Sequence, residues 1–257
     1  MVIIGRSQIA GGGTAKRLEF EYTGTYNERL DDGVVELLTS GVLTVTKDTY
    51  IDAFLVGGGG SGNGTTARSG AAAGGGSGYT KTLTKILLQK GVSYPVSIGA
   101  GGAYRTDSSE IGHAGGETTA FGTTVKGGQP STNKGVGGEG GSGGGGTTKQ
   151  GGSDGSNGSN SGANLGGKGQ GTTTREFGEA TGKLYAGGGS GGISDSTLSG
   201  VAGGAGGGGM GGTSAAIGRN GEANTGGGGG GKGSMSGSNS HAGTGGSGIV
   251  CIRLHKE

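Results

Sequence analysis

The chain lacks most of the residues that build an ordinary hydrophobic core. It has no tryptophan, four phenylalanines and seven tyrosines in 257 residues, and its hydrophobic residues amount to 28%. Soluble domains contain roughly 45–50% apolar residues, in a count that includes glycine. This composition therefore excludes a conventional core that runs through the whole chain.

Cysteine, proline and long apolar runs are scarce as well. The single cysteine, Cys251, allows no internal disulfide, and the apolar run around it predicts a buried structural thiol. Two prolines and the lack of a long strict Gly-X-Y period exclude collagen. The apolar start MVIIGRSQIA is too short for a signal peptide, and no stretch approaches the roughly 20 apolar residues of a membrane span. We therefore expect synthesis in a cytoplasm without Sec export, and no membrane insertion.

A strong excess of charge of one sign is also missing. The formal net charge is +2, charged residues make up 15% of the chain, and the lysines and arginines are scattered singly. Nucleic-acid-binding proteins concentrate basic residues on one face, so we expect no nucleic-acid partner. The low net charge also argues against intrinsic disorder, because disordered chains usually carry a high one.

Glycine is the residue that the chain has in excess, and it is unevenly distributed. Of the 76 glycines, residues 1–56 contain seven, residues 57–248 contain the other 69 (76 − 7), and residues 249–257 contain none. The chain thus combines two compositions, an ordinary one at its ends and a glycine-rich one between them.

The ordinary segments have strand patterns, with β-branched residues and period-two alternation. We predict strands at 34–38 and 42–46 on either side of a short turn, and at 50–56, 79–88, 92–99, 118–125 and 249–254. Pro95 predicts an edge strand or a strand irregularity. The closing strand needs partners, and the early strands are the expected ones. The glycine-rich region would then be a closed insertion and not a free tether.

A bundle of polyproline-II-type helices made of glycine suits such an insertion. This helix has three residues per turn, a rise of about 3.1 Å and no internal hydrogen bonds, so its backbone groups pair with neighbouring helices. Only glycine lets backbones approach that closely. Non-glycine residues should recur every third position, as in these sets: Val136, Glu139 and Ser142; Ser190 and Ile193; Ala202 and Ala205; Thr244 and Ser247. Met210 and the run 226–231 break the pattern.

Richer segments interrupt the glycine tracts. We expect them to be loops on a rigid scaffold, a common layout for recognition. Their side chains are candidate receptor contacts: Tyr104, Arg105 and Asp107; Arg175, Phe177 and Tyr185; Arg219 and Asn220. For the aromatic residues, a plug in a small core beneath the glycine helices is an equally good interpretation. The arginines are expected to be exposed.

Apparent motifs of nucleotide-binding and catalytic sites occur in the glycine-rich sequence, but each lacks a feature that the site requires. Gly-x-Gly-x-x-Gly recurs without a following amphipathic helix. Two near-matches to the P-loop, at 162–168 and 226–232, are followed by glycine where a magnesium-binding Ser or Thr is required. The three histidines lack metal-ligand spacing, and pairs of acids such as Glu176 and Glu179 are more common as solvated loop charges. We expect no enzyme activity, no cofactor and no metal.

Four junctions between strands and glycine tracts occur in a characteristic order: YIDAFLVGGGGSG, GGGSGYTKTLT, GVSYPVSIGAGG and GGSGIVCIR. They resemble the glycine-rich domain of many bacteriophage tail-fibre and tail-tip proteins, over roughly residues 50–254. A similar order occurs in the glycine-rich extracellular region of anaplastic-lymphoma-type receptor kinases. The resemblance implies a mainly β fold, a small jelly-roll-like β-sandwich with an inserted bundle of polyglycine-II helices over 57–248 and little or no α-helix.

The resemblance also implies a function. We expect a virion protein, a tail-fibre or tail-tip adhesin that recognises a bacterial surface glycan or outer protein, made in the host cytoplasm and released by lysis. Residues 1–40 would be an N-terminal attachment segment for other tail or fibre proteins, and residues 41–257 the glycine-rich domain. Jelly-roll-like tip proteins are often trimers, which favours a homotrimer.

Two other functions stay open. One is a purely structural tip or decoration subunit of a virion, without a receptor. The other is ice binding, because packed glycine helices can present flat faces. An ice-binding face needs regular short side chains, however, and Arg, Glu, Asp and Tyr interrupt the tracts often.

Overall fold

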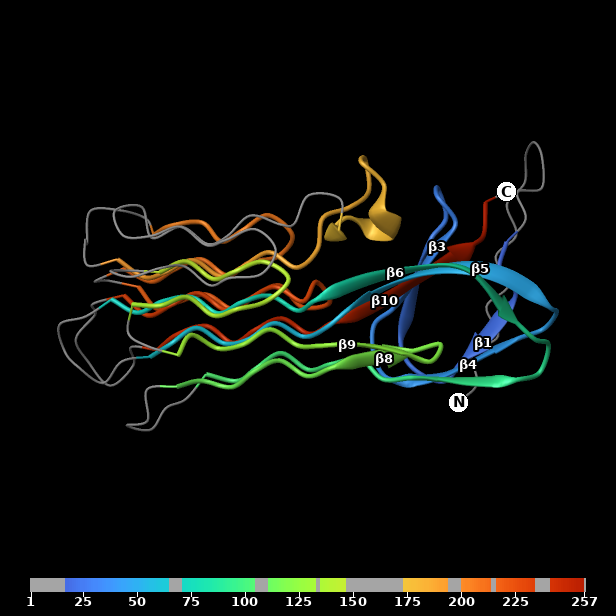
Figure 1. Ribbon diagram of the computed structural model, residues 1–257, viewed down its shortest axis with the longest axis horizontal. Coiled ribbons are helices and arrows are strands. Elements are labelled where there is room, and N and C mark those ends of the chain that lie inside the picture. Colours follow the sequence, from blue (N-terminus) through green and yellow to red (C-terminus); the bar gives the residue numbers. More distant parts are fainter. Residues whose placement is uncertain are drawn as a thin grey trace.

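The computed structural model of the protein is elongated, with β-sheets at one end and glycine-rich segments lying side by side at the other (Figure 1). The structure describes residues 17–64, 71–104, 111–132, 135–146, 173–193, 200–213, 216–233 and 241–256. Both ends of this described chain, near residues 17 and 256, lie at the sheet end.

Three antiparallel sheets make up the sheet end. The largest has the order β2 (Tyr26–Arg29), β3 (Val34–Leu37), β10 (Ile249–Leu254), β5 (Thr49–Val56) and β6 (Thr80–Leu88). The second has the order β1 (Phe20–Tyr22), β4 (Gly41–Val45) and β7 (Ser93–Val96), and a hairpin pairs β8 (Thr118–Ala120) with β9 (Thr123–Val125). Within the described residues, these strands are accompanied by one 3₁₀ turn, η2 (Glu176–Gly178). The prediction of a mainly β fold is confirmed.

The closing strand β10 holds the largest sheet together. It lies between β3 and β5, with Val250 opposite both Leu37 and Leu55. The prediction that the last strand pairs with early strands is therefore confirmed, and the glycine-rich region between β5 and β10 is a closed insertion. Pro95 lies in β7, an edge strand of the second sheet, as proline requires.

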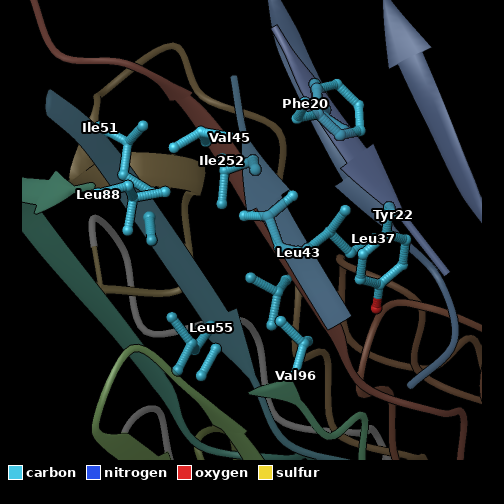
Figure 2. Packing of buried hydrophobic residues seen from close by; sticks show 14 of the residues in the cluster. Phe20, Tyr22, Leu37, Leu43, Val45, Ile51, Leu55, Leu88, Val96 and Ile252 are labelled. Atoms are coloured by element: carbon cyan, nitrogen blue, oxygen red, sulfur yellow. The ribbon is translucent and has the colours of Figure 1, made fainter. Parts of the chain in front are cut away.

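The hydrophobic core lies between the two larger sheets. Leu37, Ile51, Leu55 and Ile252 of the five-stranded sheet pack in one cluster with Leu43, Val45 and Phe20 of the three-stranded sheet (Figure 2). All are buried, and full burial of such a side chain contributes roughly 1.5–3 kcal/mol. This small core is confined to one end of the molecule, which explains how so few apolar residues suffice.

One expectation about the N-terminal part needs correction. The predicted strands at 34–38 and 42–46 do not form a hairpin, because β3 joins the five-stranded sheet and β4 joins the three-stranded one. The turn between them connects the two layers. The described part of the expected attachment segment, residues 17–40, is packed into the sandwich, since β1 pairs with β4, and β2 and β3 belong to the sheet of β10.

The glycine tracts are held by backbone hydrogen bonds with a period of three residues. Segment 57–63 shows this in full. Gly57, Gly60 and Asn63 donate to 73–79, Gly58 and Ser61 donate to 113–116, and Gly59 and Gly62 donate to 243–246, at 2.8–3.1 Å. Successive N–H groups therefore point in three directions, which is the geometry of a helix with three residues per turn. The predicted polyglycine-II bundle is confirmed.

The run of glycines at 226–231, which has no phase in the sequence, is explained by its position. All of its residues are buried. Hydrogen bonds or close backbone approaches link it to segments on every side, namely 57–63, 72–78, 187–190, 207–212, 218–221 and 243–247. Because no side of this helix faces solvent, no position in it can carry a side chain without displacing a neighbour.

Helices at the surface of the bundle follow the predicted triplet pattern in part. Ala202 and Ala205 are exposed, and Thr244 and Ser247 are half-buried. Other predicted triplets face inward, because Ser190 and Ile193 are buried.

The triplet prediction for Val136, Glu139 and Ser142, in the stretch 136–146, is wrong. This stretch is not one continuous helix. The chain reverses there, and the Gly144 N–H donates to the Gly138 carbonyl at 2.8 Å. As a result Glu139 is exposed while Ser142 is buried.

Gly229→Ala tests the packing of the bundle. The added Cβ would lie 2.2 Å from the backbone oxygen of Gly243, and the segment cannot shift without losing the 2.9 Å hydrogen bond from Gly229 to Gly60. We expect a loss of about 1–3 kcal/mol or more in the free energy of unfolding, measured by denaturant titration. Ala205→Val at the exposed surface is the control and should change it by less than about 0.5 kcal/mol. Equal stability of both variants would contradict close backbone packing.

Candidate functional site

Three of the candidate residues lie in a short insert, 173–186, which covers the outer face of the five-stranded sheet. Phe177 is 9% exposed and Tyr185 is fully buried. Their rings pack on Phe54 of β5 with centroids 6.4 Å and 5.5 Å away, and the Arg253 guanidinium lies 4.0 Å from the Phe177 ring centre. Both aromatic rings are thus plugs of a second small core, and neither is available as a receptor contact.

A buried group of charges fixes the insert to the sheet. Glu176 forms an ion pair with Arg29 of β2, whose Nη1 lies 3.4 Å from Glu36 of β3. The Tyr185 hydroxyl donates toward the carboxylates of Glu36 at 3.4 Å and Glu176 at 3.3 Å. Burial lowers the pKa of Arg29, but the hydrogen bond and the negative charge of Glu176 outweigh it and raise the pKa overall. Arg29 is therefore held as the cation that joins both glutamates.

The thiol of Cys251 lies at the edge of this group, 3.6 Å from the Tyr185 hydroxyl. Burial raises the pKa of Cys251 well above its ordinary value, and burial also raises the pKa of Tyr185. The thiol is thus neutral and enclosed, and the sequence-based prediction of a buried structural cysteine is confirmed.

A second ion pair fixes the other side of the insert. Arg253 Nη2 lies 2.7 Å from Glu179, and Arg253 Nε lies 3.5 Å from Asp52, whose other oxygen lies 2.7 Å from His255. The hydrogen bond from Arg253 lowers the pKa of Glu179. Arg175, also a candidate contact, is half-buried and donates from Nη1 to the Gly182 carbonyl at 2.9 Å. The insert is therefore a structural clasp.

The other candidates lie on the bundle, on what we call the lateral face: the outward side of segments 99–104, 241–248 and 218–224. Backbone hydrogen bonds make these segments direct neighbours, since Gly245 donates to Gly102 at 2.9 Å and Gly221 donates to Thr244 at 2.8 Å. The backbone hydrogen bonds between the glycine helices form a regular network, which we call the backbone lattice. This lattice, and not side-chain packing, sets the positions of the outward side chains on the lateral face.

Tyr104 and His241 form the aromatic part of the lateral face. Their rings are stacked, with centroids 4.4 Å apart and planes 8° from parallel, and both residues are half-buried. His241 Nδ1 lies 3.0 Å from the carbonyl of Ala242. Since a carbonyl only accepts hydrogen bonds, Nδ1 carries a proton, and Nε2 is the acceptor in neutral histidine.

Arg219 and Asn220 are exposed polar residues of the neighbouring segment 218–224. The Asn220 side-chain oxygen accepts from the Thr244 N–H at 2.9 Å, which orients its amide. Tyr104 contacts segment 241–248 through His241, and Asn220 contacts it through Thr244. Arg219 precedes Asn220 in the chain, and none of the three belongs to the clasp. Arg105 and Asp107 lie outside the described residues.

His241 is the residue that sequence reasoning missed. Considered only as a metal ligand, it has no suitable spacing. Its signal is the phase of a helix with three residues per turn, because His241, Thr244 and Ser247 recur at every third position and are all half-buried. The same outward row that was recognised for Thr244 and Ser247 therefore includes the stacked imidazole.

The chemical groups of the lateral face determine what it can bind. A stacked ring pair, an oriented amide and a guanidinium can bind a polar ligand with apolar patches. Among the described residues, no three His, Cys, Asp or Glu side chains gather as a metal site would require. The described segments also include no helix that is long and apolar enough to span a membrane.

The fold and this face define a class of protein: a β-sandwich whose strands lead into a bundle of glycine helices with side chains presented on its outer surface. A family model described as a glycine-rich domain matches residues 38–255, so the chain belongs to the glycine-rich domain family. No curated protein matches the chain. The match begins at residue 38, although β1, β2 and β3 precede it in the same sandwich.

Arg29→Ala tests the clasp. The two glutamates would lose the cation between them while staying buried. We expect a loss of about 3 kcal/mol in the free energy of unfolding, the lower end of the range for breaking a buried pair, because the Arg29 side chain is 23% exposed. Lys47→Ala, which breaks the exposed Lys47–Glu19 pair, is the control and should cost roughly 0–1 kcal/mol. Equal losses in the two variants would contradict a buried anchoring cluster.

Glu179→Gln tests the second anchor through its pH dependence. Because the folded-state pKa of Glu179 is lowered, its contribution to stability is present above the unfolded-state pKa of about 4.3 and is lost as pH falls through the folded-state pKa. We expect the wild type to melt at a higher temperature than the variant at pH 7, and the difference to disappear once the pH falls below the folded-state pKa of Glu179. A difference that is constant with pH would contradict this. Glu21→Gln at the exposed surface of β1 is the control and should leave the melting temperature at pH 7 unchanged.

Proposed function

We propose that the protein is a bacteriophage tail-fibre or tail-tip adhesin that recognises a receptor on the host bacterial surface. The observation that carries the proposal is the stacked Tyr104–His241 pair on the lateral face. Arg219 and Asn220 are exposed in the neighbouring segment 218–224. In a chain with so few aromatic residues, a ring pair at the bundle surface contributes nothing to the sandwich core. Its chemistry is that of a binding surface.

The scaffold beneath the pair supports a recognition role. Each glycine helix is hydrogen-bonded to its neighbours through the backbone, so outward side chains need no core of their own to be positioned. A rigid support reduces the conformational entropy that binding would otherwise cost. Surface positions of such a scaffold tolerate exchange of side chains, because the lattice does not depend on them.

The arrangement of the two ends of the molecule supports it further. The glycine helices run away from the sheets to the opposite end of the molecule (Figure 1). The first and last described residues lie at the sheet end. On this proposal, the sandwich end contacts other tail or fibre proteins, and the opposite end and the lateral face meet the host.

The remaining parts of the proposal follow from a virion origin. The partner on the host is a bacterial surface glycan or outer protein, and the protein is made in the host cytoplasm and released by lysis as part of the tail. It acts by binding and not as an enzyme. Family membership alone supports only the glycine-rich domain, so the adhesin role depends on the lateral face.

Tyr104→Ala tests the proposed function. Fluorescently labelled full-length protein would be incubated with a panel of bacterial strains that differ in surface polysaccharide, and bound protein measured by flow cytometry. We expect the wild type to bind a subset of strains, and the variant to bind them at least roughly tenfold more weakly, because an aromatic contact is lost.

The matched control is Tyr50→Ala, which removes a tyrosine that is 49% exposed on β5 at the sheet end. It should leave binding unchanged. If the wild-type protein binds no strain and does not reduce infection of any strain, the adhesin proposal is wrong and a purely structural virion subunit is favoured. Binding that Tyr104→Ala leaves intact would remove the lateral face from the receptor site.

A further inference from the structure

A groove of about 820 Å³, including the space at its mouth, lies where the sandwich meets the lateral face. Leu38, Thr39 and Ser40 of the β3–β4 connection and Ile98 after β7 line its sandwich side. Ala100, Asn224 and Ser247 line its bundle side. The groove thus joins residues that are far apart in the sequence, and the clasp takes no part in it.

Three polar side chains of the groove each accept a hydrogen bond through their oxygen. The Ser40 hydroxyl oxygen accepts the Ile98 N–H at 2.9 Å, and the Thr39 hydroxyl oxygen accepts the Thr25 N–H at 2.7 Å. A hydroxyl that already accepts still has its O–H to donate. The Asn224 side-chain oxygen accepts from the Ser247 hydroxyl at 3.1 Å, which leaves the amide nitrogen as the donor. Three neutral donor groups are thereby fixed by the backbone and by each other.

Among the described residues, no charged side chain lines the groove, and Leu38 and Ile98 add half-buried apolar surface. Neutral donors beside apolar patches complement a ligand with many oxygen acceptors and C–H faces but no net charge. A neutral saccharide has this combination of groups. An anionic ligand would call for a cation, and the described residues that line the groove include none.

The groove continues along the same face as the stacked rings. Ser247 lines it, and Thr244 and His241 follow in the same outward row. Six residues at about 3.1 Å each place His241 roughly 19 Å from Ser247 along the helix axis. An extended chain of sugars lying along this row could reach from the groove to the Tyr104–His241 pair.

We propose that this groove is a saccharide subsite that binds a neutral segment of a bacterial surface polysaccharide. The inference rests on the proposed adhesin function and names its ligand class and second contact point. On this view the stacked rings hold one part of an extended glycan, and the groove holds another with hydrogen bonds from Thr39, Ser40 and Asn224.

Ala100→Trp tests the subsite, since Ala100 is exposed in the groove wall and its replacement fills the space from outside the lattice. The probe is a glycan array of bacterial O-antigen and capsule oligosaccharides, neutral and acidic, followed by calorimetric titration of the full chain with those that bind. We expect a neutral oligosaccharide to bind, and Ala100→Trp to weaken it at least tenfold. Ala205→Trp, at another exposed alanine of the bundle, is the matched control and should bind as the wild type does.

A second, smaller change tests the hydrogen-bond donor of Asn224 without filling the groove. Asn224 has a φ of +58°, so Asn224→Gly removes the amide without straining the backbone. We expect the affinity for the oligosaccharide, measured by calorimetric titration, to fall about threefold to tenfold, as for one lost hydrogen bond. Melting temperatures would confirm that each variant is folded.

The outcomes distinguish this inference from the proposed function. If the wild type binds cells and Ala100→Trp binds cells and oligosaccharides equally well, the groove is not a subsite and the adhesin proposal stands. If only acidic oligosaccharides or only outer proteins bind, the neutral-saccharide assignment is wrong. If oligosaccharides bind through the groove but no strain is bound, the subsite stands and the adhesin proposal falls.

Discussion

Close approach of glycine backbones is the constraint on which the rest of this structure depends. In the bundle, N–H and C=O groups are satisfied only by other segments, because a helix of this kind has no internal hydrogen bonds. A Cβ at Gly59 or Gly245 would lie 2.0 Å or less from a neighbouring carbonyl oxygen. The absence of side chains therefore allows the backbone pairing that replaces a hydrophobic core over most of the chain.

The sandwich supplies what the lattice cannot supply for itself, which is a fixed register. Glycine segments are alike, because they have no side chains that could select one neighbouring segment over another. β5 continues directly into Gly57, and Gly248 leads directly into β10, so the pairing of Val56 with Ile249 aligns the segments that extend from them. Hydrophobic packing at one end thus sets the hydrogen-bond partners of the bundle, and the two halves of the molecule depend on each other.

The functional candidates divide along the same line. Phe177 and Tyr185 lie where apolar surface of the sheet needs cover, and the ion pairs of Glu176 and Glu179 fasten that cover. Tyr104 and His241 lie on the bundle surface, where the backbone hydrogen bonds hold the helices without them, and the proposed function assigns them to binding. In this architecture, a large side chain on the bundle surface is a better indicator of function than one in the sandwich insert.

The sequence by itself determined the mainly β fold, most strand positions and the three-residue period, because alternation and glycine content act locally along the chain. The sequence did not determine which residues from distant segments contact one another. The reversal at 140–141, the division of β3 and β4 between two sheets, and the stacking of Tyr104 on His241 depend on contacts between distant segments. Only the tertiary structure decided whether an aromatic residue is a plug or a surface contact, since glycine neighbours look the same in both cases.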